Sequence, residues 1–367
     1  MTDMQYFVEY FVEVCSGGAW NIVPDCPPFT APQEAEAHRQ QYQSQNRNSW
    51  LTRVTKYRTQ IDINKIPHHV KTPGRATVLL PPGLGDIHWV FLKLQGFLAQ
   101  NGYTGADAWV WDAGGPRRSA EFVSRIPFVR FVDYIEFRSH PERRGLHEFC
   151  QKPNPVMQNK WGFDYVIALN GYLEAGLPLE SALDGAPVNW EYPILQTAAE
   201  ADYWQEQGAI GPWILMYFSG LAQMFDRWTA IITPDRVVEL ARHLQSRLPG
   251  RRVLMVGLPW DKGFAEKVTG VAIENMVGKT NPDQYFALLR GADAMIGFAN
   301  GNTILTTYFG VPTVMIWNRD RYQHPGFHTN WVGPESSYFP MELDDFDACV
   351  IADKITSLID RSNLAHV

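Results

Sequence analysis

The stretch ATVLLPPGLGDIHWVFLKLQGFL, residues 76 to 98, decides the fold class of this chain. It opens with the apolar run Ala76–Leu80, passes through a Pro-Pro-Gly-Leu-Gly turn, and continues into apolar residues at helical spacing from Ile87. Asn101-Gly102 then ends the segment. A strand, a glycine turn and a helix in this order predict one unit of an α/β fold.

The same alternation continues along the chain in two series. The first contains expected strands at Ala108–Trp111, Tyr134–Phe137 and Tyr165–Leu169, and the second runs from Trp213–Phe218 to Thr313–Trp317. Short apolar runs separated by helices favour parallel sheets that are covered on both faces. A chain of 367 residues also fits two domains of about 150 residues each. We therefore predict two Rossmann-like domains.

We expect four segments along the chain. Residues 1–70 form an N-terminal extension of unknown role, in which Tyr6–Val14 and Trp20–Val23 suit a hairpin and Gln33–Asn46 suits an exposed helix. The two Rossmann-like domains cover residues 71–205 and 206–340, with Glu191–Gly211 as their connection. A C-terminal helix then occupies residues 341–367, where Phe346–Ile359 is amphipathic.

Composition excludes several classes of protein. The net charge of −7 provides no overall field that would attract nucleic acid. The four cysteines are far apart and the histidines lack ligand spacing, so neither a disulfide framework nor a metal site is expected. The N-terminus lacks the pattern of a secretory signal, and no apolar run reaches about 18 residues. We expect a cytoplasmic protein without a transmembrane segment.

The first candidate site is the turn Gly83-Leu84-Gly85-Asp86. It follows a strand and opens a helix, which is where open α/β sheets bind ligands. The alternative is a plain tight turn with Asp86 as the helix cap. A dinucleotide fingerprint would require a third glycine, and His88 stands at that position. Gly83, Gly85 and His88 are the candidate residues of this turn beside Asp86.

Two further turns carry candidate residues in the second series. At residues 300–303 a strand leads into a small polar turn at a helix start, which suits an anion such as a diphosphate, although an ordinary cap by Asn300 or Asn302 is the alternative. Ser219-Gly220 follows the strand Trp213–Phe218, and Arg227 comes shortly after it. Arginine suits phosphate recognition, although surface arginines are common.

Together, these motifs resemble the ADP-heptose lipopolysaccharide heptosyltransferase family of GT-B glycosyltransferases, over roughly residues 75 to 320. The segment from Val78 to Leu98 is similar to the family's strand, G-x-G-D turn and helix, and residues 310–314 match its G-V-P-T-V strand. Two positions depart from the family: Ala299 replaces an Asp and Ile304 replaces a His. The resemblance therefore supports the fold and the reaction better than it supports heptose as the donor sugar.

The resemblance implies a GT-B fold, two Rossmann-like domains that face a cleft, and an inverting transfer from a nucleotide-diphosphate sugar to an acceptor hydroxyl. It makes Asp86 the catalytic base and assigns Gly83, Gly85 and His88 to an acceptor-side turn. It also places Arg227 where the family has a phosphate-binding lysine. We expect neither a cofactor nor an essential divalent cation. The donor-binding residues would be Ser219, Gly220, Arg227, Gly257, Val277, Gly278, Asn300, Gly301, Asn302 and Thr303.

Two alternatives remain open at this point. The loss of the family's Asp and His fits a non-catalytic nucleotide-sugar binding protein. The second alternative is a viral-type glycosyltransferase that acts on modified DNA bases. The net negative charge of the chain argues against it. For the favoured enzyme, the acceptor is a glycan, a lipid-linked glycan or another hydroxyl compound.

Overall fold

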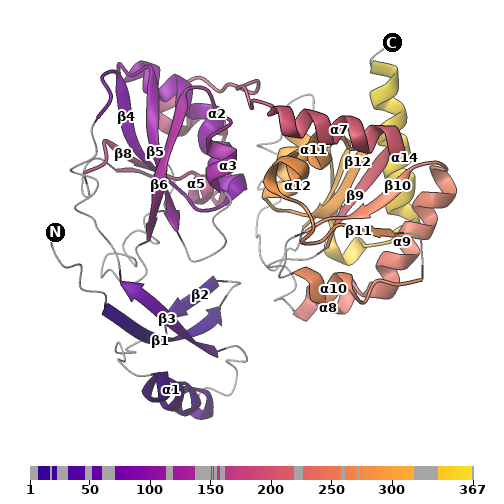
Figure 1. Ribbon diagram of the computed structural model, residues 1–367, viewed down its shortest axis with the longest axis horizontal. Coiled ribbons are helices and arrows are strands. Elements are labelled where there is room, and N and C mark those ends of the chain that lie inside the picture. The colour runs from indigo at the N-terminus through magenta and orange to yellow at the C-terminus, as the bar shows by residue number, and fades with distance from the viewer. Residues whose placement is uncertain are drawn as a thin grey trace.

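The computed structural model describes residues 7–16, 19–22, 32–45, 52–59, 71–112, 119–136, 150, 152, 155–157, 162–218, 226–257, 261–270, 273–317 and 338–365. Within these residues the chain forms a small N-terminal sheet followed by two α/β domains (Figure 1).

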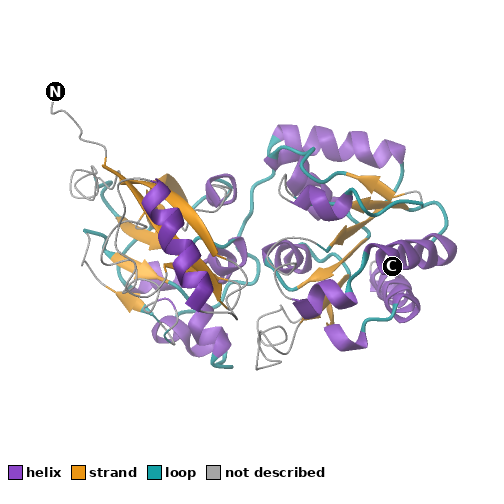
Figure 2. Ribbon diagram, turned by 90° about the horizontal axis from the view of Figure 1, so that it is seen from below, coloured by secondary structure: helices purple, strands orange, loops and turns teal. Residues whose placement is uncertain are grey.

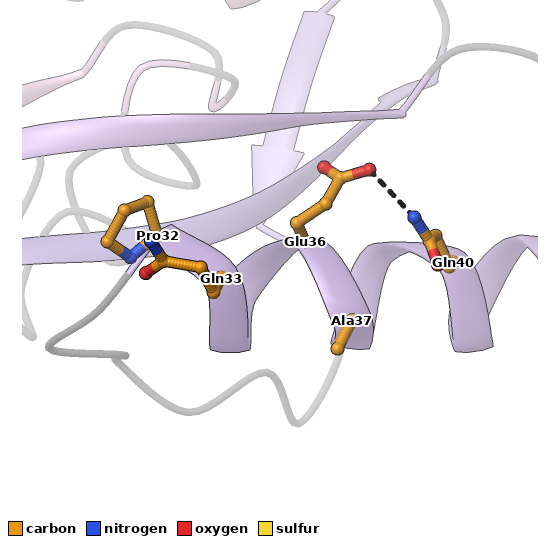
Figure 3. Close-up of a pocket in the computed structure, with 5 residues that line it drawn as sticks. All are labelled: Pro32, Gln33, Glu36, Ala37 and Gln40. Carbon is orange, nitrogen blue, oxygen red and sulfur yellow. Dashed lines mark hydrogen bonds between the residues drawn. The ribbon is translucent and has the colours of Figure 1, made fainter.

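The N-terminal segment is an antiparallel sheet with one helix. Strands β1 (Phe7–Ser16), β2 (Ala19–Ile22) and β3 (Thr52–Thr59) lie in the order β2-β1-β3, and α1 (Pro32–Gln45) packs on β1 and β3. The hairpin and the helix agree with the sequence analysis, which did not predict β3. A shallow pocket on α1 contains none of the predicted site residues (Figure 3), and its lining residues are Pro32, Gln33, Glu36, Ala37 and Gln40.

The first α/β domain is built around β4, the strand predicted before the glycine turn. Its elements are β4 (Arg75–Leu80), α2 (Leu84–Gln100), β5 (Gly105–Asp112), α3 (Ser119–Val123), β6 (Val129–Glu136), β7 (Val156–Met157), β8 (Tyr165–Ile167) and α5 (Asn170–Glu174). The sheet order is β6-β5-β4-β8-β7, with all pairs parallel except β7 with β8. Val78 and Leu80 belong to the core beneath α2, whereas Leu79 belongs to the core on the opposite face. This alternation is what a strand covered on both faces requires.

The second α/β domain has the strand order of a Rossmann fold. Its strands are β9 (Trp213–Tyr217), β10 (Arg252–Met255), β11 (Ile273–Asn275), β12 (Ala294–Phe298), β13 (Thr313–Trp317) and β14 (Tyr338–Glu342). They are all parallel and lie in the order β11-β10-β9-β12-β13-β14, which is 3-2-1-4-5-6 in chain order. The prediction of two Rossmann-like domains is confirmed.

Helices cover both faces of this second sheet (Figure 2). They are α8 (Asp226–Ile231), α9 (Pro234–Arg247), α10 (Lys262–Ala265), α11 (Pro282–Gly291), α12 (Gly301–Tyr308) and α14 (Ala348–Ala365). Helix α14 packs on α9 and β13, and Ile351 and Ile355 are buried in the core of this domain. The C-terminal helix is therefore part of the second domain and not a separate unit.

The connection between the α/β domains contains helical structure. The 3-10 turn Leu179–Ser181 and α6 (Ala182–Gly185) lead into an irregular stretch and then α7 (Ala198–Ile210), which packs on α11. The boundary expected after residue 205 falls inside α7. Because α7 is anchored on the second domain, the change of domain occurs before it.

Candidate active site

The turn that carries Asp86 lies at the switch point of the first sheet. From β4 the chain order proceeds to β5 and β6 on one side, and β8 lies on the other side. The carboxyl ends of β4 and β8 therefore flank the crevice where open α/β sheets bind ligands. Gly83 follows β4 at this edge and Asn170 follows β8.

Asp86 is not the cap of α2. Gly83 is the N-cap, with extended backbone and no side-chain cap, so Asp86 occupies the third helical position. Its carboxylate folds back over Gly83, because a Cβ at residue 83 would lie 2.5 Å from Asp86 Oδ2. The residue is partly exposed. Glycine at position 83 thus leaves the room that this carboxylate occupies.

Cys150 is a neighbour of Asp86 that the sequence analysis did not identify. Burial, with a smaller contribution from the negative charge of Asp86, raises the pKa of the Cys150 thiol to about 12. The side chain is buried against the face of the first sheet opposite α2. The thiol therefore stays protonated. No sequence signal links the two residues, which are brought together only by the fold.

The second turn, Asn300-Gly301, lies at the switch point of the second sheet, between β9 and β12. Asn300 is the N-cap of α12: its Oδ1 accepts from the N–H groups of Asn302 at 2.7 Å and Thr303 at 3.2 Å. Thr303 Oγ1 in turn accepts from the Asn300 N–H at 3.1 Å. The capping alternative is thus realised, and the side chains of Asn302 and Thr303 are buried.

Asn300 also has a side-chain donor that the cap does not use. Its Nδ2 is buried and has no hydrogen-bond partner in the described part of the chain. The residue as a whole is partly exposed. The amide nitrogen of Asn300 and the positive end of α12 are therefore the polar features that this turn offers to an anion.

The remaining predicted donor residues lie along the same edge of the second sheet. Gly257 follows β10, Val277-Gly278 follows β11, and the Gly278 N–H donates to the Gly257 carbonyl at 3.0 Å. Val277 is buried in the core, so only its backbone is available there. Arg227 belongs to α8, but its side chain lies outside the described residues, as do Ser219 and Gly220. Their donor-binding roles stay predictions.

The two turns meet across the domain boundary. A Cβ on Gly301 would lie 2.8 Å from the Gly85 nitrogen and 2.9 Å from Leu84 Cβ, so only glycine fits this approach. Farther along, Gly85 also faces Ile304, and His88 faces Tyr308. Helices α2 and α12 therefore run in the same direction with their N-termini side by side. Each N-terminus carries roughly half a positive charge, so the pair favours an anion at this end.

His88 does not line this site, contrary to its assignment to the acceptor-side turn. It is 2% exposed, and burial lowers its pKa to about 3, so the ring is neutral. The ring faces α12 and the connecting segment, where Nδ1 is 2.6 Å from the Tyr192 hydroxyl. The helical position five residues after Gly83 points into the contact between the domains and away from the turn.

Neither a metal cluster nor a membrane span is found in the described part of the chain. Across those ranges, no group of three or more His, Cys, Asp or Glu side chains is arranged to hold a metal ion. No helix there is both long and apolar enough to cross a bilayer.

No family profile and no curated protein matches this chain in sequence. Among solved structures, ADP-heptose lipopolysaccharide heptosyltransferase II of E. coli superposes with a TM-score of 0.55 at 16% identity, covering 79% of this chain and 99% of that one. A glycosyl transferase family 9 structure from Veillonella parvula gives 0.54 at 12% identity, covering 79% and 98%. At these identities the likeness concerns the fold, and it confirms the predicted GT-B arrangement.

Proposed function

We propose that this chain is a GT-B glycosyltransferase that moves a sugar from a nucleotide-diphosphate sugar to an acceptor hydroxyl, with inversion and without an essential divalent cation. The contact between Gly85 and Gly301 carries the proposal, because it sets the Asp86 turn beside the Asn300 turn. Each turn lies at the switch point of its own Rossmann-like sheet. A carboxylate and an anion-favouring helix terminus are thus adjacent.

The donor would lie on the second domain. Its diphosphate would meet the positive end of α12 and the Nδ2 of Asn300, with Arg227 as the predicted cationic partner. Its base would lie against the backbone around Gly257 and Gly278. The two structural neighbours named above are described as a heptosyltransferase that uses ADP-heptose and a glycosyl transferase, which supports a sugar donor of this class.

Asp86 would act as the general base. It takes the proton of the acceptor hydroxyl while that oxygen bonds to the anomeric carbon, and the bond from that carbon to the diphosphate oxygen breaks on the opposite face. Such assistance is typically worth about 10²- to 10⁴-fold. The positive ends of α2 and α12 and Arg227 would stabilise the charge on the departing diphosphate, the task that a metal ion performs elsewhere.

Ligand stabilisation tests the donor class. ADP, UDP, GDP and their hexose and heptose conjugates are each added to the full chain while thermal unfolding is followed. A true donor at a hundred times its Kd adds about 2.7 kcal/mol to stability. Absence of stabilisation by all of these nucleotides would contradict the proposal.

A non-catalytic nucleotide-sugar binding protein is the second candidate. The observation in its favour is Ile304, whose apolar side chain packs toward Gly85 at the position where the resembled family has histidine. Slow hydrolysis of a bound sugar nucleotide, abolished in Asp86→Asn, distinguishes the enzyme from the binding protein. The enzyme that we propose acts in the cytoplasm on a glycan, a lipid-linked glycan or another hydroxyl acceptor.

A further inference from the structure

Tyr192, in the segment between the α/β domains, contacts both of them. Its side chain is 1% exposed, and its ring stacks on Tyr308 of α12 with 4.8 Å between the centroids. Its hydroxyl is hydrogen-bonded to His88 of α2 at 2.6 Å, and its backbone carbonyl accepts from the Tyr308 hydroxyl. One residue of the connection therefore joins the two helices whose N-termini form the candidate site.

The surroundings of this residue are apolar. Phe91 of α2 lies edge-on to the Tyr192 ring at 5.9 Å, and His88 lies edge-on to Tyr308 at 4.9 Å. The pKa of Tyr192 is raised well above its ordinary value, chiefly by burial, so its hydroxyl stays protonated. A hydrogen bond between neutral groups in such a setting has no competing water. Loss of one partner would leave the other unsatisfied.

The position of this contact lets it influence how α2 and α12 are arranged at the candidate site. On α2, His88 lies about one turn from Gly85, and on α12, Tyr308 lies about two turns from Gly301. The two helices touch at the glycines and again between His88 and Tyr308, and the Tyr192 ring packs against both members of this second contact, so two points fix their relative direction. Asp86 stands in the first turn of α2, between the two points of contact.

A second junction beside it is ionic. Arg125 of the first domain bonds to Glu200 of α7, which also accepts from Arg290 of α11 at 2.9 Å. Arg125 further bonds to Asp283 at 2.6 Å. This junction holds the domains together, but its side chains come from the turn after α3 and from α7 and α11. Tyr192, by contrast, contacts α2 and α12 themselves.

We propose that Tyr192 is a positioning residue, which holds the Asp86 carboxylate at the distance from the Asn300 turn that transfer requires. The inference rests on the proposed function. Tyr192 touches neither donor nor acceptor, and it acts through α2 and α12. Removal of its hydroxyl should therefore impair the chemical step and leave donor binding, which belongs to the second domain, largely intact.

The experiment compares Tyr192→Phe with Tyr172→Phe in the full chain. Tyr172 is the matched control, because it is also buried and its hydroxyl is bonded to Ser181 of the 3-10 turn, a bond that involves neither α2 nor α12. We measure the Kd of ADP, UDP and GDP by calorimetry, and the kcat of hydrolysis for the sugar nucleotide that stabilises the wild type. Tyr192→Phe should lower kcat about tenfold, since small misplacements of reacting groups carry large penalties, while the Kd changes less than about twofold.

Hydrogen exchange gives a readout that does not depend on the reaction. Amides of residues 84–90 and 301–308 should exchange faster in Tyr192→Phe than in Tyr172→Phe or the wild type. If Tyr192→Phe fails to fold, Tyr308→Phe replaces it, because it removes the bond to the Tyr192 carbonyl. An unchanged kcat, a parallel loss of kcat and affinity, or unchanged exchange would overturn the inference. A wild type without nucleotide binding would refute the proposed function alone, and exchange would still decide whether Tyr192 joins the helices.

Discussion

The buried imidazole of His88 predicts how stability depends on pH. The ring is neutral in the folded protein, where burial lowers its pKa to about 3. In the unfolded chain its pKa returns to about 6.5. Below that value the unfolded state binds a proton that the folded state does not bind, so stability falls as the pH falls from about 6.5 towards 3. At pH 8 the residue contributes no such penalty.

The size of the effect follows from these two pKa values. Each pH unit between them costs about 1.4 kcal/mol. At pH 5, which lies one and a half units below the unfolded pKa, the penalty from His88 is about 2 kcal/mol. That is a large share of the stability of an ordinary domain, which is about 5–15 kcal/mol.

The measurement is urea unfolding at pH 8, 7, 6 and 5, for the wild type, His88→Gln and His88→Phe. Both variants lack the titrating ring, and glutamine retains a polar partner for Tyr192. Between pH 8 and pH 5 the wild type should lose about 2 kcal/mol more than either variant, because all other groups are shared. Parallel profiles for the wild type and the His88 variants would refute the reasoning.

Three further tests, two of them with a matched control variant, are measured by denaturant unfolding, and turnover is measured in addition for Gly301→Ala. Glu200→Ala removes a buried carboxylate that pairs with two arginines and should cost about 3–5 kcal/mol, whereas Asp353→Asn, at an exposed pair, should stay close to the wild type. Gly301→Ala places a Cβ against the Gly85 backbone and should cost about 1–3 kcal/mol and lower turnover, whereas Gly208→Ala, with open space around it in α7, should gain about 0.5–1 kcal/mol. Asp184→Gly should stabilise by about 0.5–1 kcal/mol, because Asp184 has a positive φ of 54° that glycine adopts freely. Equal losses of stability for Glu200→Ala and Asp353→Asn would contradict the importance of burial for the ion pair. Equal effects of Gly301→Ala and Gly208→Ala would contradict the close approach at Gly301. A loss of stability for Asp184→Gly would contradict the strain assigned to its positive φ.

The elements that the sequence predicted well are those whose burial is apolar. Strand Thr313–Trp317 has the bounds expected from its apolar run, and β4 and α2 agree with the pattern around the glycine turn. Helix α7 falls in the segment that was expected only as a connection between the domains, with no helix predicted there. Its buried side chains include Glu200 and Gln207, which are polar, so ion pairs and hydrogen bonds anchor it and no apolar periodicity marks it.

Strand β14 was missed for a different reason. Pro340 stands inside it, and proline within a run argues against a strand. The strand lies at the edge of the sheet, paired only with β13, where a missing N–H is tolerated. Local sequence rules could not distinguish this edge from the interior, because the strand order is a property of the whole domain.

In the candidate site, too, the local patterns could be predicted from the sequence and the tertiary contacts could not. The sequence identified both glycine turns, because each is a local pattern of strand, glycine and helix. It could not show that Gly85 and Gly301 touch, nor that His88 faces the other domain, since both depend on the direction of α12 relative to α2. The glycines therefore have a role beyond letting a ligand approach the backbone. They let two helix N-termini come together, and in the mechanism that we propose Asp86 can deprotonate an acceptor next to a donor on the other domain only while that contact holds.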